Sequence, residues 1–102
     1  MAIFDANSIT AGSVVITQDM PRIGGVNWTG ATNTPTWTTS TAASVFGSIT
    51  LISGMTITAS TQTYTMEGRS TYTITNATKT WAKAFTFDNP SGTYTLQDAL
   101  NI

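Results

Sequence analysis

The fold is decided by residues 62–96, which read QTYTMEGRSTYTITNATKTWAKAFTFDNPSGTYTL. Within this stretch Thr-x-Thr recurs as Thr63-Tyr64-Thr65, Thr71-Tyr72-Thr73-Ile74-Thr75, Thr78-Lys79-Thr80 and Thr93-Tyr94-Thr95. In an extended chain successive side chains point to opposite faces, so the threonines share one face and most of the apolar residues share the other. Turn residues, among them Gly68, Asn76 and Gly92, interrupt the pattern. The stretch therefore predicts short β-strands separated by turns.

The same alternation extends through the rest of the chain. It is found at residues 13–18, 26–29, 36–39, 44–53 and 85–87. No window of ten or more residues has apolar residues at helical spacing. The sequence therefore predicts an all-β protein.

Two β architectures compete for a chain of this kind. An antiparallel β-sandwich needs strands joined mostly as hairpins, and the hairpin dipeptides Asn-Gly and Asp-Gly are absent. A β-solenoid, or parallel β-helix, needs short strands, tight corners and a recurring rung. Four similar runs, at residues 26–28, 47–50, 64–66 and 85–87, recur at intervals of roughly 20 residues. We predict a short-stranded β-solenoid of about four to five rungs, with an antiparallel β-sandwich as the alternative.

The composition excludes several classes of function. The 102-residue chain has four Lys or Arg, five Asp or Glu and a formal net charge of -1, so it offers no basic surface for nucleic acid. It has no cysteine and no histidine, which removes disulfides, thiolate chemistry and the usual zinc, haem and iron–sulfur ligands. No apolar run approaches the roughly 20 residues that span a bilayer, and Met1 to Thr10 lacks the features of a signal peptide. We expect no cofactor, no nucleic-acid partner and no membrane insertion.

Length and composition describe one folded domain, residues 1–102. Charged residues make up 9% of the chain and hydrophobic residues 40%, with three Trp, three Tyr and four Phe to fill an interior. Hydroxyl and amide side chains are left to cover the surface. Such a surface is typical of extracellular or virion proteins, and we expect one of these two locations.

A resemblance to known proteins rests on a few runs of sequence. They are residues 26–35 (VNWTGATNTP), 46–58 (FGSITLISGMTIT), 72–75 (YTIT) and 92–100 (GTYTLQDAL). Together they resemble the repeat stretch of Thr-rich parallel β-helix proteins found in phage and marine metagenomic sequences, within the broad class of phage structural and tail-associated proteins. The resemblance covers residues 4–102 and implies a structural or surface-binding role in a phage particle.

The resemblance also implies that the solenoid does not stand alone. Similar proteins continue for several more rungs after a segment like Leu96-Gln97-Asp98. The chain is therefore either part of a longer solenoid or has its end covered by another subunit. An uncovered solenoid end presents unpaired N–H and C=O groups that invite strand addition. We predict a homo-oligomer, with other virion proteins or surface glycans as further partners.

The carboxylates are the first candidates for catalysis. They are Asp5, Asp19, Glu67, Asp88 and Asp98. Such residues supply the acid–base pair of a glycosidase or the acidic cluster of a polysaccharide lyase, but their spacing supports neither. Asp88 and Asp98 sit beside turn residues, where Asp caps the backbone. Glu67 and Arg69 flank a glycine, and we expect them to form a solvent-exposed pair at a corner.

Other chemistry lacks the residues that it needs. A serine nucleophile would need a base, and without histidine only Lys79 or Lys83 remains, neither within a catalytic motif. Calcium at Asp88 and Asn89 would have a single carboxylate as its anchor. We expect no enzyme activity, no catalytic residues and no metal site.

A binding surface is the remaining candidate site. Its predicted residues are Trp37, Thr63, Thr65, Thr73 and Thr75. Regular outward threonine arrays on a flat solenoid would suit ice binding, but the ladders are irregularly spaced along the sequence and interrupted by Arg69 and Lys79. Ordinary solvent-facing strand positions are therefore favoured. Tryptophan and tyrosine rings outside the core could stack on sugars, although the alternation turns most of them inward.

Three functions from different classes remain open. The first is a non-enzymatic structural protein of a phage virion or extracellular fibre, which assembles through the ends or faces of the solenoid. The second is a glycan- or host-surface-binding module of a tail fibre or adhesin. The third is an ice-binding or polysaccharide-lyase-like fragment. Low charge, missing histidine and dense strand patterning favour the first.

Overall fold

The structure of the chain is a computed structural model that describes residues 2–3, 15–18, 21–39, 41–58, 62–81 and 84–100. Within these ranges the regular elements are the short strands β1 to β12, and none of the described segments is helical. It follows that the described residues contain no long apolar helix able to cross a membrane. Thr, Tyr, Ile and Phe fit a pleated, half-buried surface, so the local sequence favours these strands. The predicted all-β class is confirmed.

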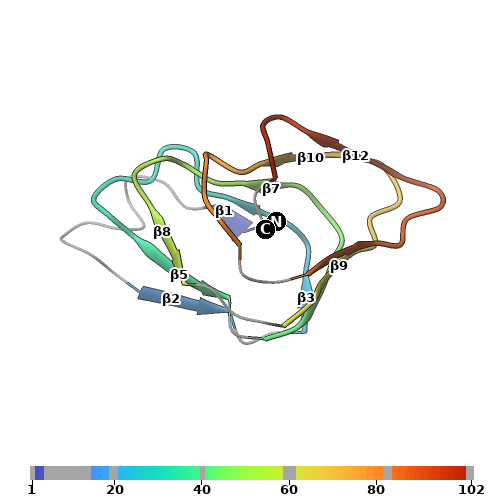
Figure 1. Ribbon diagram of the computed structural model, residues 1–102, viewed down its shortest axis with the longest axis horizontal. Helices are drawn as coiled ribbons and strands as arrows, with labels where there is room; N and C mark the ends of the chain where they lie inside the picture. The colour runs from blue at the N-terminus through green and yellow to red at the C-terminus, as the bar shows by residue number, and fades with distance from the viewer. Residues whose placement is uncertain are drawn as a thin grey trace.

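The strands form three sheets. Sheet A holds β1 (Ala2–Ile3), β4 (Val26–Asn27), β7 (Ile49–Thr50), β10 (Thr71–Thr75) and β12 (Thr93–Leu96). Sheet B holds β2 (Val15–Gln18), β5 (Thr36–Thr39) and β8 (Thr56–Thr58). Sheet C holds β3 (Arg22–Ile23), β6 (Ala43–Val45), β9 (Tyr64–Met66) and β11 (Phe85–Phe87). From β1 to β10 the chain visits the three sheets in strict rotation, and Figure 1 shows its turns lying over one another as loops around a common interior.

This three-sided coil is a β-solenoid. Every pairing between described strands is parallel and joins strands of the same side on successive turns. The predicted short-stranded β-solenoid is confirmed. The alternative, an antiparallel β-sandwich, is excluded because no antiparallel pairing joins the described strands. About three turns are complete on all three sides, while sheet A alone, with five strands, reaches the upper limit of the predicted four to five rungs.

The register differs from the predicted alignment in one respect. β4 pairs with β7, and β9 pairs with β11, as the sequence runs predicted. The four runs do not form one repeating side, because β7 continues to β10 in sheet A whereas β9 and β11 lie in sheet C. Paired positions range from 20 residues apart, as for Thr36 and Thr56, to 25 apart, as for Ile49 and Ile74. Within sheet A alone the interval varies from 22 to 25 residues, which hides the repeat in a single alignment.

Aromatic rings dominate the core. Trp37 and Trp81 are 4% and 1% exposed, and Tyr64 is fully buried. The ring centroids of Trp37 and Trp81 are 6.0 Å apart and those of Trp81 and Phe85 are 5.1 Å apart, both in edge-on geometry. The Tyr64 hydroxyl donates a hydrogen bond to Gln18 Oε1 at 2.9 Å, and burial raises the pKa of this hydroxyl. These contacts fix sheet B against sheet C through the interior.

The solenoid is wider than it is tall. The molecule measures 41 × 25 × 24 Å, and its turns are stacked along the shortest dimension, the viewing direction of Figure 1. Neighbouring strands lie about 4.8 Å apart, so the strands of sheet A account for most of this height. The two end faces of the coil are therefore broad relative to its height.

Glycines stack at the corner where the chain passes from sheet C to sheet A. They are Gly24, Gly47, Gly68 and Gly92, separated by 21 to 24 residues. A Cβ atom on Gly47 would lie 1.9 Å from the carbonyl oxygen of Gly24, and one on Gly92 would lie 2.2 Å from the carbonyl oxygen of Gly68. Gly24 and Gly47, and likewise Gly68 and Gly92, therefore approach backbone to backbone at this corner, whereas a Cβ atom on Gly68 would meet the side chains of Tyr72 and Tyr94.

Candidate binding surfaces and the open end of the core

The structure separates the five residues predicted to form a binding surface. Trp37 is 4% exposed, and its ring centroid lies 6.1 Å from that of Trp28 in the core. Thr36 and Thr38 occupy the outward positions of β5, so strand alternation turns Trp37 inward. Trp37 cannot contact a ligand at the surface, and its place in the predicted surface is corrected to the core.

The four predicted threonines are half-buried and lie on two sides of the solenoid. Thr65 lies in β9 of sheet C and Thr63 directly precedes that strand, whereas Thr73 and Thr75 belong to β10 of sheet A. Side chains on different sides of a coil point in different directions. These threonines therefore contribute to two surfaces, not one.

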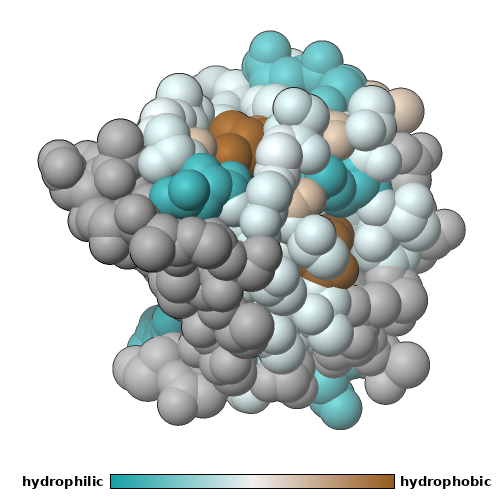
Figure 2. Space-filling view, turned by 90° about the vertical axis from the view of Figure 1, so that its left-hand side faces the viewer, coloured by the Kyte–Doolittle hydropathy of each residue, from teal (hydrophilic) through white to brown (hydrophobic). Residues whose placement is uncertain are grey.

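The Trp and Tyr side chains, all of which the structure describes, form no exposed aromatic surface on which a sugar ring could stack. The three tryptophans and Tyr64 are buried, and Tyr72 and Tyr94 are half-buried. The residues coloured in Figure 2, which shows one side of the molecule, are mostly white, the colour of weakly polar residues, with smaller hydrophobic and hydrophilic areas between them. The surface offers hydroxyl groups more than rings or charges.

Sheet A carries a regular group of outward threonines. We call it the sheet A array, and its members are Thr50, Thr71, Thr73, Thr75, Thr93 and Thr95. The first two threonines of β10 lie beside the two threonines of β12, and the third lies beside Thr50 of β7. Neighbouring rows are about 4.8 Å apart, and alternate positions along a strand are about 6.6 Å apart. The array is thus a small two-dimensional lattice of methyl and hydroxyl groups.

The array is free of charge. None of the strands of sheet A contains Asp, Glu, Lys or Arg. Arg69 lies in the corner before β10 and Lys79 lies in the turn after it, so neither interrupts the strands. The expectation of irregular, interrupted ladders was based on linear spacing and is wrong in three dimensions for this sheet.

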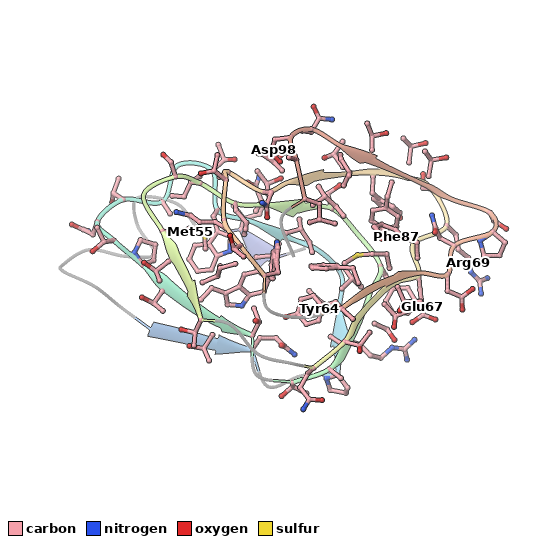
Figure 3. The ribbon with its side chains drawn as sticks, viewed as in Figure 1. Met55, Tyr64, Glu67, Arg69, Phe87 and Asp98 are labelled. Atoms are coloured by element: carbon pink, nitrogen blue, oxygen red, sulfur yellow. The ribbon has the colours of Figure 1, made fainter. Side chains whose placement is uncertain are left out.

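A polar pocket of about 380 Å³ lies at the corner between sheets C and A. Its lining residues are Glu67, Arg69, Asp88, Asn89, Pro90 and Ser91. Because Met66 pairs with Phe87, the following residues, Glu67 and Asp88, stand side by side on adjacent turns. Figure 3 shows Glu67 and Arg69 at this corner, outside the coil.

The pocket combines two carboxylates, Glu67 and Asp88, with the guanidinium group of Arg69. In the part of the chain that the structure describes, no three His, Cys, Asp or Glu side chains gather at one place. Glu67 and Arg69 both line this pocket at the corner, but no ion pair within 4.0 Å joins these two described residues, so the predicted pair is not formed. The other candidates Asp5, Asp19 and Lys83 lie outside the described residues. The pocket is a polar surface of mixed charge.

A network of side-chain hydrogen bonds surrounds residues 76–79, the Asn76 turn. Asn76 is fully buried, and its Oδ1 accepts a hydrogen bond from Trp81 Nε1 at 2.5 Å. Its Nδ2 donates to the carbonyl of Lys79 and, at 3.2 Å, to that of Ala99. The Lys79 ammonium group donates to the carbonyl of Ser53 at 2.8 Å. The turn is therefore tied to the core, to the preceding turn of the coil and to the chain after β12.

Asp98, which follows β12 on the next rung, also binds the Asn76 turn. Its Oδ1 accepts a hydrogen bond from the Asn76 N–H at 2.6 Å, and its Oδ2 accepts one from the Ala77 N–H at 2.7 Å. Ala77 and Thr78 have φ angles of 52° and 60°, a region that L residues rarely adopt. Charge-assisted hydrogen bonds to two successive N–H groups offset the cost of this conformation. Asp98 caps a turn as predicted, but that turn belongs to the preceding rung and not to its own backbone.

The core is open at the C-terminal end of sheet A. Strand pairing stacks Val26, Ile49, Ile74 and Leu96 in one inward column. The first three are 3%, 0% and 1% exposed, whereas Leu96, the last, is 47% exposed. Leu96 is exposed because the column ends, not because the alternation turns it outward.

Sheet C ends in the same way. Val45, Met66 and Phe87 form one column by strand pairing, and their exposures are 0%, 0% and 47%. Figure 3 shows the Phe87 side chain within the outline of the coil, next to the end strands. In the described sheets, β11 and β12 each pair on one side only. The end face thus combines exposed apolar side chains with two strand edges.

Tyr94 holds β12 in place at this end. Its hydroxyl accepts a hydrogen bond from the Gly68 N–H and donates one to the Val45 carbonyl, both at 3.2 Å. Its ring centroid lies 5.4 Å from that of Tyr72 and 5.9 Å from that of Phe87. Burial raises the pKa of the Tyr94 hydroxyl, and the hydrogen bond from Gly68 opposes that change. β12 is therefore a well-anchored strand with a free edge.

Strand alternation assigns Phe87 and Leu96 to the apolar, inward face, yet both are 47% exposed. The alternation assigns each residue to a face, and both side chains do point inward. Their exposure follows from their position in the column, since each is the last member of its stack.

Comparisons with family models, curated proteins and solved structures find no match to this chain. What can be proposed about its function therefore depends on its own residues and geometry.

Proposed function

We propose that the chain is a non-enzymatic structural module that associates with further copies of itself, of the kind that builds a virion or an extracellular fibre. The open end carries this proposal, because Phe87 and Leu96 are each 47% exposed while their column partners are buried. Burial of apolar surface contributes roughly 25 cal/mol per Å², so covering this end stabilises an assembly. The resemblance to Thr-rich phage solenoids supports the same role.

The strand edges at the end face also favour association. Natural proteins block exposed edges with Lys, Pro or bulges, because an unpaired edge invites another strand. β11 and β12 read FTF and TYTL, and neither contains a charged residue or a proline. Their composition therefore permits strand addition.

The proposal is tested by placing a charge on the end face. Phe87→Asp should weaken self-association at least tenfold, because a carboxylate resists desolvation at an interface. The matched control is Thr86→Asp, which adds the same charge to the outward face of the same strand. Sedimentation velocity over a concentration series measures both variants beside the native chain, and circular dichroism checks that each is folded. A native chain that sediments as a 10.8 kDa monomer at every concentration would contradict the proposal.

A second function, ice binding, is favoured by the sheet A array. Threonine is β-branched and has few rotamers in a strand, so its methyl and hydroxyl groups are held in place. The repeats of about 4.8 and 6.6 Å are of the same order as the water spacings in planes of hexagonal ice. The array also lacks charged groups, which would impose hydration shells of their own.

Ice binding makes a direct prediction. The native chain should show thermal hysteresis, and Thr73→Lys combined with Thr95→Lys should abolish it by placing two ammonium groups within the lattice. Thr86→Lys, on sheet C, should leave the hysteresis unchanged. Nanolitre osmometry on a cooled solution gives the measurement. Absence of hysteresis in the native chain at its highest soluble concentration would reject this second function.

A further inference from the structure

We infer that residues 97–100, which we call the end segment, act as a latch that limits self-association at the C-terminal end of the coil. The latch holds Trp81 in the core, and its release adds that side chain to the exposed Phe87 and Leu96. The inference rests on the proposed structural function and names how its association site is regulated.

The C-terminal end is open on two sides of the coil and closed on the third. Leu96 ends its column in sheet A, Phe87 ends its column in sheet C, and both are 47% exposed. Trp81 lies on the last turn, between β10 and β11, yet it is 1% exposed. Sheet B has no described strand on this turn, since it ends at β8. Contacts other than strand pairing therefore close this side.

The segment that contains Trp81 runs inside the coil. In Figure 1 the orange segment after β10 passes within the outline of the other turns and does not lie over β8. The Trp81 ring packs edge-on against Trp37 and Phe85, and its indole N–H donates to Asn76 Oδ1. Asn76 therefore fixes the indole in the position where it fills the end of the core.

The end segment lies on the Asn76 turn. Figure 1 shows that the chain after β12 turns back into the outline of the coil. Asp98 accepts hydrogen bonds from the N–H groups of Asn76 and Ala77, and the Ala99 carbonyl accepts one from Asn76 Nδ2 at 3.2 Å. Leu100 is half-buried and packs against the core. The end segment therefore covers the turn whose side chain holds the indole.

The end segment has the features of a segment that opens locally. It follows β12 without forming a strand, and Gln97 and Ala99 are exposed. Hydrogen bonds near solvent and few apolar contacts are typical of segments that open at a free energy well below that of global unfolding. The open latch is therefore a minor state of the folded chain.

Release of the latch enlarges the apolar end face. Without the end segment, the Asn76 turn loses its contacts with Asp98 and Ala99, and Trp81 is no longer held beneath it. Tryptophan carries a large apolar surface and is enriched among the residues that contribute most to protein interfaces. When only a minor state is fully competent to bind, the apparent association constant falls with the population of that state. A closed latch therefore weakens self-association.

Two variants release the latch by different means. Asp98→Ala removes the acceptor of two backbone N–H groups, whereas Leu100→Ser removes the apolar contact with the core and keeps that acceptor. Each should raise the association constant about tenfold, as measured by sedimentation velocity over a concentration series. Asp88→Ala is the matched control, because it removes the same charge from an exposed position outside the latch and should leave the association constant unchanged. Circular dichroism checks that each variant is folded.

Hydrogen exchange measures the opening of the latch independently of association. The Trp81 indole N–H should exchange about tenfold faster in both release variants than in the native chain, because its acceptor Asn76 is no longer held in place. Nuclear magnetic resonance at a concentration where the chain is monomeric records this rate. Phe87→Asp in the Leu100→Ser background should remove the gain in association, because the added contact lies on the same end face.

The outcomes distinguish the latch from the proposed function. Faster indole exchange without stronger association, in a native chain that self-associates, would overturn the latch and leave the function intact. Unchanged indole exchange in both variants, or a gain in association that Phe87→Asp does not remove, would also overturn the latch. Association of the release variants beside a monomeric native chain would support the latch and remove the function from its closed form. If the native chain and both variants were monomeric at every concentration, the latch and the function would fail together.

Discussion

Replacing Gly47 by alanine should lower the free energy of unfolding by about 3 kcal/mol or more. The added Cβ would lie 1.9 Å from the carbonyl oxygen of Gly24, and the nearest atoms around it are all backbone. A side chain could rotate away, but two stacked turns must move apart to make room. A loss of that size should shift the melting temperature by roughly 10 to 20 °C in a chain of this length. Thermal and urea denaturation followed by circular dichroism measure the effect.

Gly54→Ala is the matched control for this substitution. A Cβ atom on Gly54 would meet no atom within 4 Å, and the residue is exposed. Its effect should stay within about 1 kcal/mol and can be favourable, since alanine restricts the unfolded chain more than glycine does. Equal stability changes for Gly47→Ala and Gly54→Ala would show that the turns are not in backbone contact at the corner.

Removing the Asp98 carboxylate should cost about 2 to 3 kcal/mol, because two backbone N–H groups lose charge-assisted hydrogen bonds. In Asp98→Ala the N–H groups of Asn76 and Ala77 have no replacement acceptor in the described network. The turn between them would then lack support for its left-handed conformation. Denaturant titration in dilute solution gives the change in unfolding free energy. Nuclear magnetic resonance of the Trp81 indole N–H reports on the network directly, because that group donates to Asn76 Oδ1.

Two further variants separate the clamp from the loss of a negative charge. Asp88→Ala removes a carboxylate from an exposed site and should change stability by less than about 0.5 kcal/mol. Thr78→Gly relieves the backbone at a φ of 60° and should recover about 1 kcal/mol in the Asp98→Ala background. If Asp98→Ala and Asp88→Ala were equally stable, the hydrogen bonds from Asp98 would contribute nothing to folding.

The class of fold could be predicted because the residues of each strand show the alternation on their own. Thr71 to Thr75 alternates hydroxyl and apolar side chains, and the structure forms β10 over the same five residues. The choice of solenoid over sandwich followed from the absent hairpin dipeptides and the recurring runs, and the parallel pairing confirms it. The exact partner of each strand could not be predicted, since the corners differ in length and the interval between paired strands changes from turn to turn.

The candidate site was harder to predict, for a reason that particular residues show. Trp37 sits between two threonines in the sequence, a context that marks a strand but does not say which face meets solvent. Phe87 and Leu96 carry the inward signature and still reach water, because exposure at an end depends on what lies above and not on the local pattern. Asp98 meets the Asn76 turn across 21 to 22 residues, and no local rule pairs them.

The uniform stacking of turns has a consequence for how the chain comes apart. Strand pairing joins each turn only to the turns directly above and below it, so this part of the cohesion behaves as a sum of nearest-neighbour terms along one dimension. Fraying should then begin at the outermost coil and move inward, and every added subunit would replace two vulnerable boundaries with interior. The melting temperature would rise with the number of stacked subunits, and it would be lower in a dilute sample than in a concentrated one.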